Sequence, residues 1–151
     1  MINSKKILLF SLSAIIILLS ACTEKREKVS QTYADGLPRK TEEYIVKDGK
    51  EVLFKETFYF PATQKNQKQQ KYIEGTYDET SGNRDKTWTS WFDNGQKNSE
   101  LTYSDGKENG IYHVWYRNGQ LRISGQYKEG KQVGKWFTYD SLGNVTSEKT
   151  F

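Results

Sequence analysis

The side chains that most often carry catalysis are scarce in this sequence of 151 residues. His113 is the only histidine, so there is neither a histidine-based zinc site nor an H-E-x-x-H motif. A serine nucleophile would need His113 as its base, and no G-x-S-x-G motif presents such a serine. Paired carboxylates can hydrolyse glycosides, and the acids that lie near aromatic residues are Glu100, Asp140 and Glu148. Ordinary surface charge explains these acids better, so the sequence predicts that the protein is not an enzyme.

The glycine and aspartate patterns indicate turns rather than ligand sites. Asp35, Asp48 and Asp105 each directly precede a glycine, and no loop concentrates the several oxygens that calcium needs. Every glycine falls at a turn, a repeat junction or a strand position, so none builds a phosphate-binding loop. We therefore expect neither a metal nor a cofactor.

Cys22, the only cysteine, follows a segment typical of a secretory signal. Lys5 and Lys6 precede a mostly apolar run over residues 7–19, which is shorter than the roughly 20 residues of a membrane span. The residues Leu-Ser-Ala-Cys at 19–22 resemble the lipobox of bacterial lipoproteins. The resemblance implies a signal peptide over residues 1–21, cleavage before Cys22, and a lipid on that residue. An uncleaved signal anchor is the alternative.

Lipidation would place the protein in the cell envelope. Two or more acyl chains give stable anchoring to a membrane, which we expect to be the outer membrane if the organism has one. Residues 22–31 are then the lipidated cysteine and a polar tether, and residues 32–151 form one domain. With a single cysteine, no disulfide can form within the chain.

The charge balance gives no support to nucleic-acid binding. Residues 1–21 hold two Lys and no acid, so a chain cleaved there keeps 21 Lys and Arg against 19 Asp and Glu, and its net charge falls from +4 to +2. Nucleic-acid binding rests on a clustered cationic surface. We expect no nucleic-acid partner.

The dominant feature of the remaining sequence is an internal repeat of 24 residues. Residues 91–96 read WFDNGQ and residues 115–120 read WYRNGQ. The same offset aligns further pairs, which are Tyr103 with Tyr127, Gly110 with Gly134, Trp115 with Tyr139, Gly119 with Gly143, and Tyr127 with Phe151.

The turns within each repeat predict β-hairpins. Asn94-Gly95 and Asn118-Gly119 are strong signals for a two-residue type I′ turn, which needs positive φ at both residues. Asp105-Gly106 and Glu129-Gly130 follow 11 residues after them, so short strands alternate with tight turns. No stretch after residue 22 keeps a helical apolar period. We predict an all-β fold in which antiparallel hairpins form an open, curled meander sheet.

Two-residue turns would place the side chains on two faces. Face A, the expected core side, collects Trp88, Phe92, Leu101, Tyr103, Tyr112, Tyr116, Leu121, Ile123, Tyr127, Trp136, Val145 and Phe151. Face B carries a column of Trp91, Trp115 and Tyr139 among polar neighbours that include Arg122, and it also carries His113. This column is either a second, thinner packing surface or a binding stripe for a glycan, a peptide or a partner protein. The candidate binding residues are Trp91, Trp115, Arg122 and Tyr139.

The unit W-Y-x-N-G-Q followed by Y-x-x-G-K-x-x-G-x-W resembles the bacterial MORN-variant repeat. The likeness is clearest over residues 72–151 and partial over residues 33–60, which makes about four units. It implies a curled, largely single-layered sheet of stacked hairpins and no catalytic residue. Proteins with this repeat are often labelled antitoxins. A lipidated, exported chain would instead have to neutralise an envelope partner, which would make it an immunity protein.

Two kinds of function remain open from the sequence. The repeat sheet is a membrane-anchored platform for an envelope or secreted protein partner, or it is a lipoprotein that binds glycan or peptidoglycan through the aromatic column. A passive spacer is the third possibility.

Overall fold

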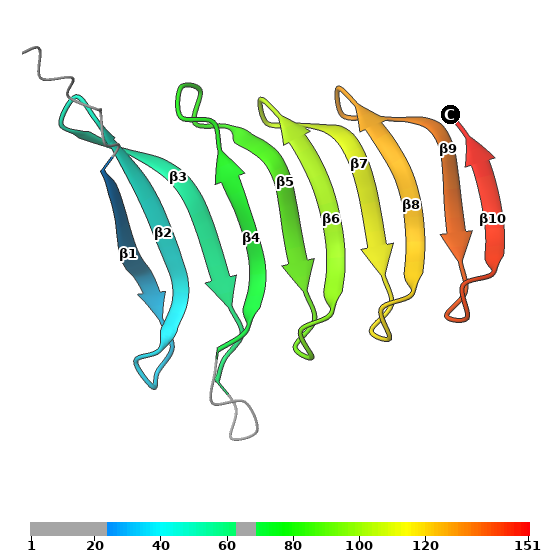
Figure 1. Cartoon of the computed structure of the whole chain (residues 1–151), viewed down its shortest axis with the longest axis horizontal. Helices are drawn as coiled ribbons and strands as arrows, with labels where there is room; N and C mark the ends of the chain where they lie inside the picture. Colours follow the sequence, from blue (N-terminus) through cyan, green and yellow to red (C-terminus); the bar gives the residue numbers. More distant parts are fainter. Residues whose placement is uncertain (1–23, 63–68) are drawn as a thin grey trace, which may run out of the picture.

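The computed structural model describes residues 24–62 and 69–151. They form ten strands in one antiparallel sheet, and each strand pairs with its neighbours in chain order (Figure 1). The strands are β1 (Lys25–Thr32), β2 (Pro38–Lys47), β3 (Lys50–Tyr59), β4 (Lys71–Tyr77), β5 (Arg84–Trp91), β6 (Lys97–Ser104), β7 (Lys107–Trp115), β8 (Leu121–Lys128), β9 (Lys131–Tyr139) and β10 (Val145–Thr150). The sheet is open, with β1 and β10 as its edges. The predicted all-β array of antiparallel hairpins is confirmed.

The expected signal peptide and Cys22 lie outside the described residues. Within residues 24–62 and 69–151, no helix is long and apolar enough to cross a membrane.

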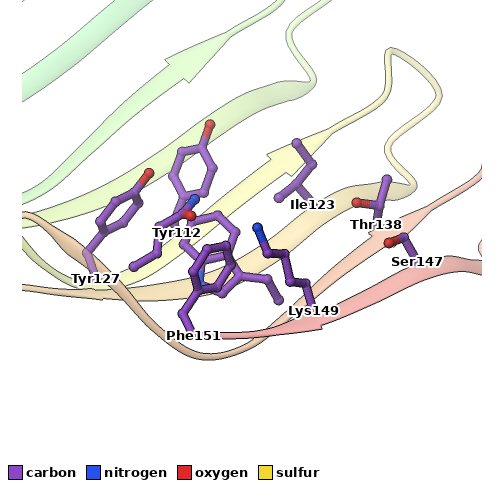
Figure 2. A pocket seen from close by; sticks show the side chains of 9 residues that line it. Tyr112, Ile123, Tyr127, Thr138, Ser147, Lys149 and Phe151 are labelled. Carbon is purple, nitrogen blue, oxygen red and sulfur yellow. The ribbon is translucent and has the colours of Figure 1, made fainter.

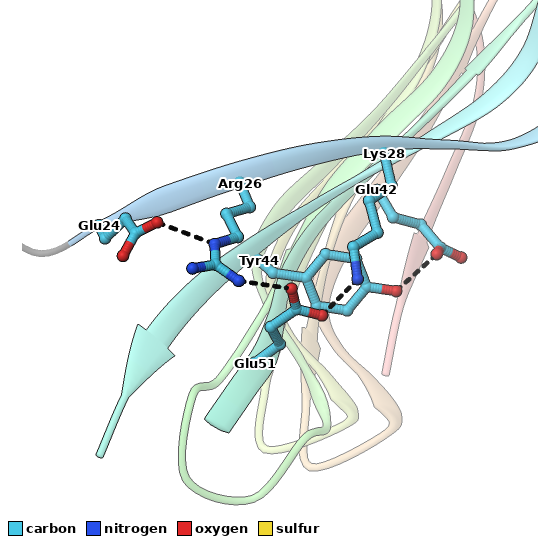
Figure 3. Close-up of polar contacts among 6 residues, drawn as sticks. All are labelled: Glu24, Arg26, Lys28, Glu42, Tyr44 and Glu51. Atoms are coloured by element: carbon cyan, nitrogen blue, oxygen red, sulfur yellow. Dashed lines mark hydrogen bonds and ion pairs between the residues drawn. The ribbon is translucent and has the colours of Figure 1, made fainter. Parts of the chain in front are cut away.

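The predicted polar tether is wrong over residues 25–31, because these residues belong to the edge strand β1. The strand is exposed along its whole length, yet its backbone pairs with β2. Its alternating charges reach across β2 to Glu51 on β3, which pairs with Arg26 (Nη1–Oε1 3.3 Å) and with Lys28 (Figure 3). A hydrogen bond to Glu24 is the largest influence raising the pKa of Arg26. A strand lined with charges is a common protection for the edge of a sheet.

The Asn-Gly turns have three residues rather than the predicted two. The Gly95 amide donates to the Phe92 carbonyl at 2.9 Å, and the Phe92 amide donates to the Gln96 carbonyl at 2.8 Å. Gly95 has a φ of 83°, whereas Asn94 does not have positive φ. This is a type I turn closed by a glycine bulge. The same hydrogen bonds recur at the turns beginning with Tyr33, Tyr116 and Asp140.

Asparagine suits these turns because its side chain forms hydrogen bonds, and not because its backbone adopts a positive φ. The Asn118 Oδ1 accepts the Gln120 amide at 3.1 Å, and its Nδ2 donates to the Ser141 carbonyl of the next turn at 2.9 Å. Asn94 makes the equivalent bonds, including one to the Arg117 carbonyl at 3.0 Å. The side chain therefore links each repeat to the next.

Type I′ geometry occurs at the opposite end of the sheet. Asp48-Gly49, Asp105-Gly106 and Glu129-Gly130 all have positive φ at both residues. The Gly130 amide donates to the Glu108 carbonyl at 2.9 Å, so this row of turns is also linked laterally.

Bulges beside the Asn-Gly turns change which face some side chains occupy. Trp88 pairs with Leu101 and Ser90 with Ser99, as two-residue turns would also require, but a bulge after Ser90 then pairs Trp91 with Lys97. Equivalent bulges pair Trp115 with Leu121 and Tyr139 with Val145. Because cross-strand partners share a face, Leu121 and Val145 lie with face B, and their placement on face A was wrong.

The best-buried rings lie on face A, as predicted for the core side. Trp88 is 5% exposed and Trp136 is 9% exposed. Each indole lies over a glycine of the preceding strand: a Cβ would fall 2.0 Å from the Trp88 ring at Gly75 and 2.3 Å from the Trp136 ring at Gly125. The glycines therefore give a single-layered sheet room to bury a tryptophan.

Candidate functional site

The three aromatic residues of the expected column lie at one end of the sheet. Trp91, Trp115 and Tyr139 are the last residues of β5, β7 and β9. They are two strands apart, a spacing of about 9.5 Å. Between them lie the first residues of the intervening strands. We call this row the aromatic stripe, and it comprises Trp91, Lys97, Trp115, Leu121, Tyr139 and Val145.

Two lysines give the stripe fixed positive charges. The Lys71 Nζ lies 5.9 Å from the centroid of the Trp91 ring, and the Lys97 Nζ lies 5.6 Å from that of Trp115. Such cation–π contacts contribute about 0.5–1 kcal/mol at exposed sites. Each ammonium also pairs with a glutamate, Lys71 with Glu74 and Lys97 with Glu100. The cations are therefore held beside the rings.

Burial and the lysine partners of Glu74 shift the pKa of its carboxyl in opposite directions. Desolvation by itself would raise the pKa of this carboxyl, but hydrogen bonds from Lys71 and Lys55 hold its pKa below the ordinary value. Glu74 is therefore ionised at neutral pH and can keep Lys71 in place.

The stripe is accessible along its length. Trp91, Trp115 and Tyr139 are half-buried, and Val145 is 56% exposed. Neighbouring rings support two of the aromatic side chains: His113 lies edge to face with Trp115 at 5.5 Å, and Phe137 lies 6.3 Å from Tyr139. The result is a row of partly supported rings with an open outer side.

Arg122 does not join the stripe. The bulge between the Trp115–Leu121 pair and the next pair leaves Arg122 without a register partner on β7. Its guanidinium Cζ lies 5.7 Å from the centroid of the Tyr116 ring. Its charge also acts on Tyr112 of face A, whose pKa is raised by burial and by Tyr127 while Arg122 opposes the rise. Of the four candidate residues, Arg122 is therefore the one that is not part of this row of register pairs.

The three acids singled out for catalysis are each occupied by structural contacts. Glu100 pairs with Lys97, and Glu148 pairs with Lys135 at 2.6 Å. Asp140 closes its own turn, and hydrogen bonds from Asn144 and from backbone amides lower its pKa. Among the described residues, no group of three or more His, Cys, Asp or Glu side chains is placed to hold a metal ion.

The sequence pattern missed the residues that complete the stripe. Lys97, Leu121 and Val145 join it only because a three-residue turn and a bulge shift the first residue of each returning strand. The available signal was the side chain of Asn94 or Asn118, which can bond to the backbone two residues on and so favours a type I turn.

Comparison with known proteins supports the repeat and assigns no activity. The MORN repeat variant family matches residues 84–105 and 108–129. No match to a curated protein is found. Among solved structures, a protein of unknown function from Bacteroides fragilis NCTC 9343 is similar, with 14% identity, 86% of this chain and 94% of that chain covered, and a TM-score of 0.32. No catalytic family is indicated. Two adjacent units of the sheet, from Arg84 in β5 to Glu129 after β8, thus match the MORN repeat variant.

Proposed function

We propose that the protein is a non-catalytic platform of the cell envelope, anchored by a lipid on Cys22, which binds a protein partner through the aromatic stripe. The observation that carries the binding role is the stripe itself: three half-buried aromatic rings in line, alternating with residues of apolar or cationic character. Trp and Tyr are enriched where proteins bind one another. An accessible row of this kind can bind a partner protein without a closed pocket.

The lysines favour a protein over a glycan as the partner. A sugar ring binds an aromatic residue by stacking on its face, but the Lys71 and Lys97 ammonium groups lie over the faces of Trp91 and Trp115. The same cations can pair with carboxylates of a protein surface that packs against the rings. Charge pairing of this sort adds specificity and speeds association.

Glycan binding is the second candidate, and the even spacing of the rings supports it. Aromatic rings repeated every second strand can stack on successive units of a polysaccharide. Soluble peptidoglycan fragments should then change the tryptophan fluorescence of the chain, whereas a protein platform predicts no such change.

A pull-down from a solubilised envelope fraction tests the platform. The bait is the chain from residue 23, which contains all ten strands, and a second bait carries Trp91→Ala with Trp115→Ala. A matched control bait carries Tyr72→Ala with Leu142→Ala, which removes two exposed apolar side chains outside the stripe. Circular dichroism first checks that all three baits are folded.

The platform predicts a protein that the wild-type and control baits retain and the stripe variant loses. A toxin among the retained proteins would make this chain an immunity protein. Equal retention by all three baits, or no enriched protein at all, would contradict the platform and leave a passive spacer or glycan binding.

The anchor has a separate test. Cys22→Ala should move the chain from the membrane fraction to the soluble fraction and abolish incorporation of a labelled fatty acid. A variant that still incorporates the label would show that the lipid is not on Cys22.

A further inference from the structure

A pocket on face A, across the sheet from the aromatic stripe, has the features of a second binding site. It lies over β7–β10, has a volume of about 380 Å³, and is lined by rings of Tyr112, Tyr127, Trp136 and Phe151 (Figure 2). Small-molecule pockets are usually between about 300 and 1,000 Å³ and mostly apolar with a few polar groups. The size and lining therefore suit a small planar ligand.

The rings pack around Trp136 in a way that forms an aromatic box. Tyr127 lies edge to face with Trp136 at 5.1 Å, Phe151 at 6.0 Å, and Tyr112 is tilted against it at 5.6 Å. Phe151 follows the end of β10 and is 48% exposed. Its ring can therefore turn aside to admit a ligand beside the indole.

The indole N–H of Trp136 has no hydrogen-bond partner, although the residue is 9% exposed. The equivalent N–H of Trp88, over the other glycine, donates to the Thr76 carbonyl at 3.1 Å. A buried donor without an acceptor costs about 1–3 kcal/mol. Trp136 thus holds a buried donor, which a bound acceptor would satisfy once the rings around it move aside.

One lysine also lines the pocket. Lys149 is the register partner of Trp136, and its Nζ lies 4.3 Å from the centroid of the Phe151 ring. Lys149 forms no ion pair with any described residue, and none of the lining residues is an acid. By contrast, Lys40 on the other half of face A pairs with both Glu42 and Glu56.

From these features we propose that the pocket binds a small aromatic carboxylate, whose ring packs against Trp136 and whose carboxylate pairs with Lys149 and accepts the Trp136 indole N–H. The apolar box recognises the ring, the unpaired ammonium recognises the charge, and the unpartnered donor recognises an oxygen. The proposal does not depend on the stripe, which lies on the opposite face.

Indole-3-acetate is the probe, and the Trp indole N–H resonances of the ¹⁵N-labelled full chain in non-ionic detergent are the readout. Single Trp→Phe variants assign the resonances. The resonance of Trp136 should move downfield and saturate, while that of Trp88, whose donor is already bonded, should stay in place. The neutral analogue indole-3-ethanol should bind at least tenfold more weakly.

Lys149→Glu should weaken binding of indole-3-acetate at least tenfold, and Lys149→Met, which keeps the side-chain length, should do so less strongly. Lys50→Glu is the matched control, because it makes the same charge change at the start of β3, in the other half of the sheet. An unmoved or unsaturable Trp136 resonance would overturn the proposal. So would equal binding of the neutral analogue, or equal affinity of the Lys149→Glu and Lys50→Glu variants.

Discussion

Face A is held together differently in the two halves of the same sheet. Over β2–β4, Glu56 pairs with Lys40 and accepts a hydrogen bond from the Tyr77 hydroxyl at 2.5 Å. Burial and this bond raise the pKa of Tyr77 to about 12. Over β7–β10, the contacts are between aromatic rings around Trp136, and the nearby cation Lys149 has no partner among the described residues. One kind of hairpin repeat can therefore cover a single-layered sheet either with charge pairs or with aromatic rings. Only the second arrangement leaves a cation and a donor free.

The two halves share one packing rule, in which a residue without bulk lies beneath a large ring. Gly75 lies under Trp88, and Gly125 lies under Trp136. In the repeat between them, Leu101 pairs with the smaller ring of Tyr112. The side-chain volumes therefore compensate across neighbouring strands.

The largest expected effect comes from breaking that shared rule. Gly75→Ala and Gly125→Ala should each lower the free energy of unfolding by about 3 kcal/mol, because the new methyl group would overlap the indole and overpacking costs about 1–3 kcal/mol or more. Urea unfolding measures the change. Ser124→Ala, beside Gly125 but on face B, should cost less than about 0.5 kcal/mol. Full stability of either glycine variant would show that the indole does not lie over the glycine.

Removing a charge should separate the two halves. Glu56→Gln should destabilise the protein by about 2 kcal/mol, since it leaves the nearly buried Lys40 with one partner fewer. Glu148→Gln breaks the exposed pair with Lys135 and should cost at most about 0.5 kcal/mol. Thermal unfolding of both variants measures the difference, and similar losses would contradict the contrast between the halves.

Losing the link between repeats should have an intermediate effect. Asn118→Ala removes a bond to Gln120 and one to Ser141, which should cost about 1 kcal/mol. Leu142 occupies the matching position of the last turn and is 81% exposed, so Leu142→Ala should leave stability unchanged. Chemical denaturation compares the two variants. Equal stability of both would show that the asparagine does not link the turns.

Acid should weaken the half that is rich in charge pairs first, and by the smallest amount. Lys40 and Tyr44 lower the pKa of Glu42, and Lys71 and Lys55 lower that of Glu74. A lowered pKa contributes stability above the ordinary value near 4.5, which is lost as the pH falls through the folded pKa.

We expect a loss of about 1 kcal/mol or less for β2–β4 between pH 5 and about pH 3. Hydrogen exchange by mass spectrometry should show faster exchange there than in β7–β9 over this range. Uniform acceleration across the sheet would contradict the assignment.

The sequence predicted the repeat, the all-β sheet and the pairing of β5 with β6 at Trp88–Leu101 and Ser90–Ser99. These follow from periodic residues such as Trp88 and Tyr127 and from glycines that only turns explain. It mispredicted the strand register beside the Asn-Gly turns. Asn94 and Asn118 stabilise these turns through side-chain hydrogen bonds and not through a positive φ. That one error moved Leu121 and Val145 to the wrong face. The prediction of a polar tether was wrong for another reason. Arg26 and Lys28 of β1 form ion pairs with Glu51, which lies two strands away on β3.

Photo-crosslinking in intact cells tests the aromatic stripe as a binding surface most directly. A photoreactive phenylalanine analogue replaces Tyr139 in the stripe in one strain and exposed Tyr72 outside it in another. We expect a discrete crosslinked protein from position 139 and none from position 72. Adducts from position 72 alone, or from neither position, would contradict it.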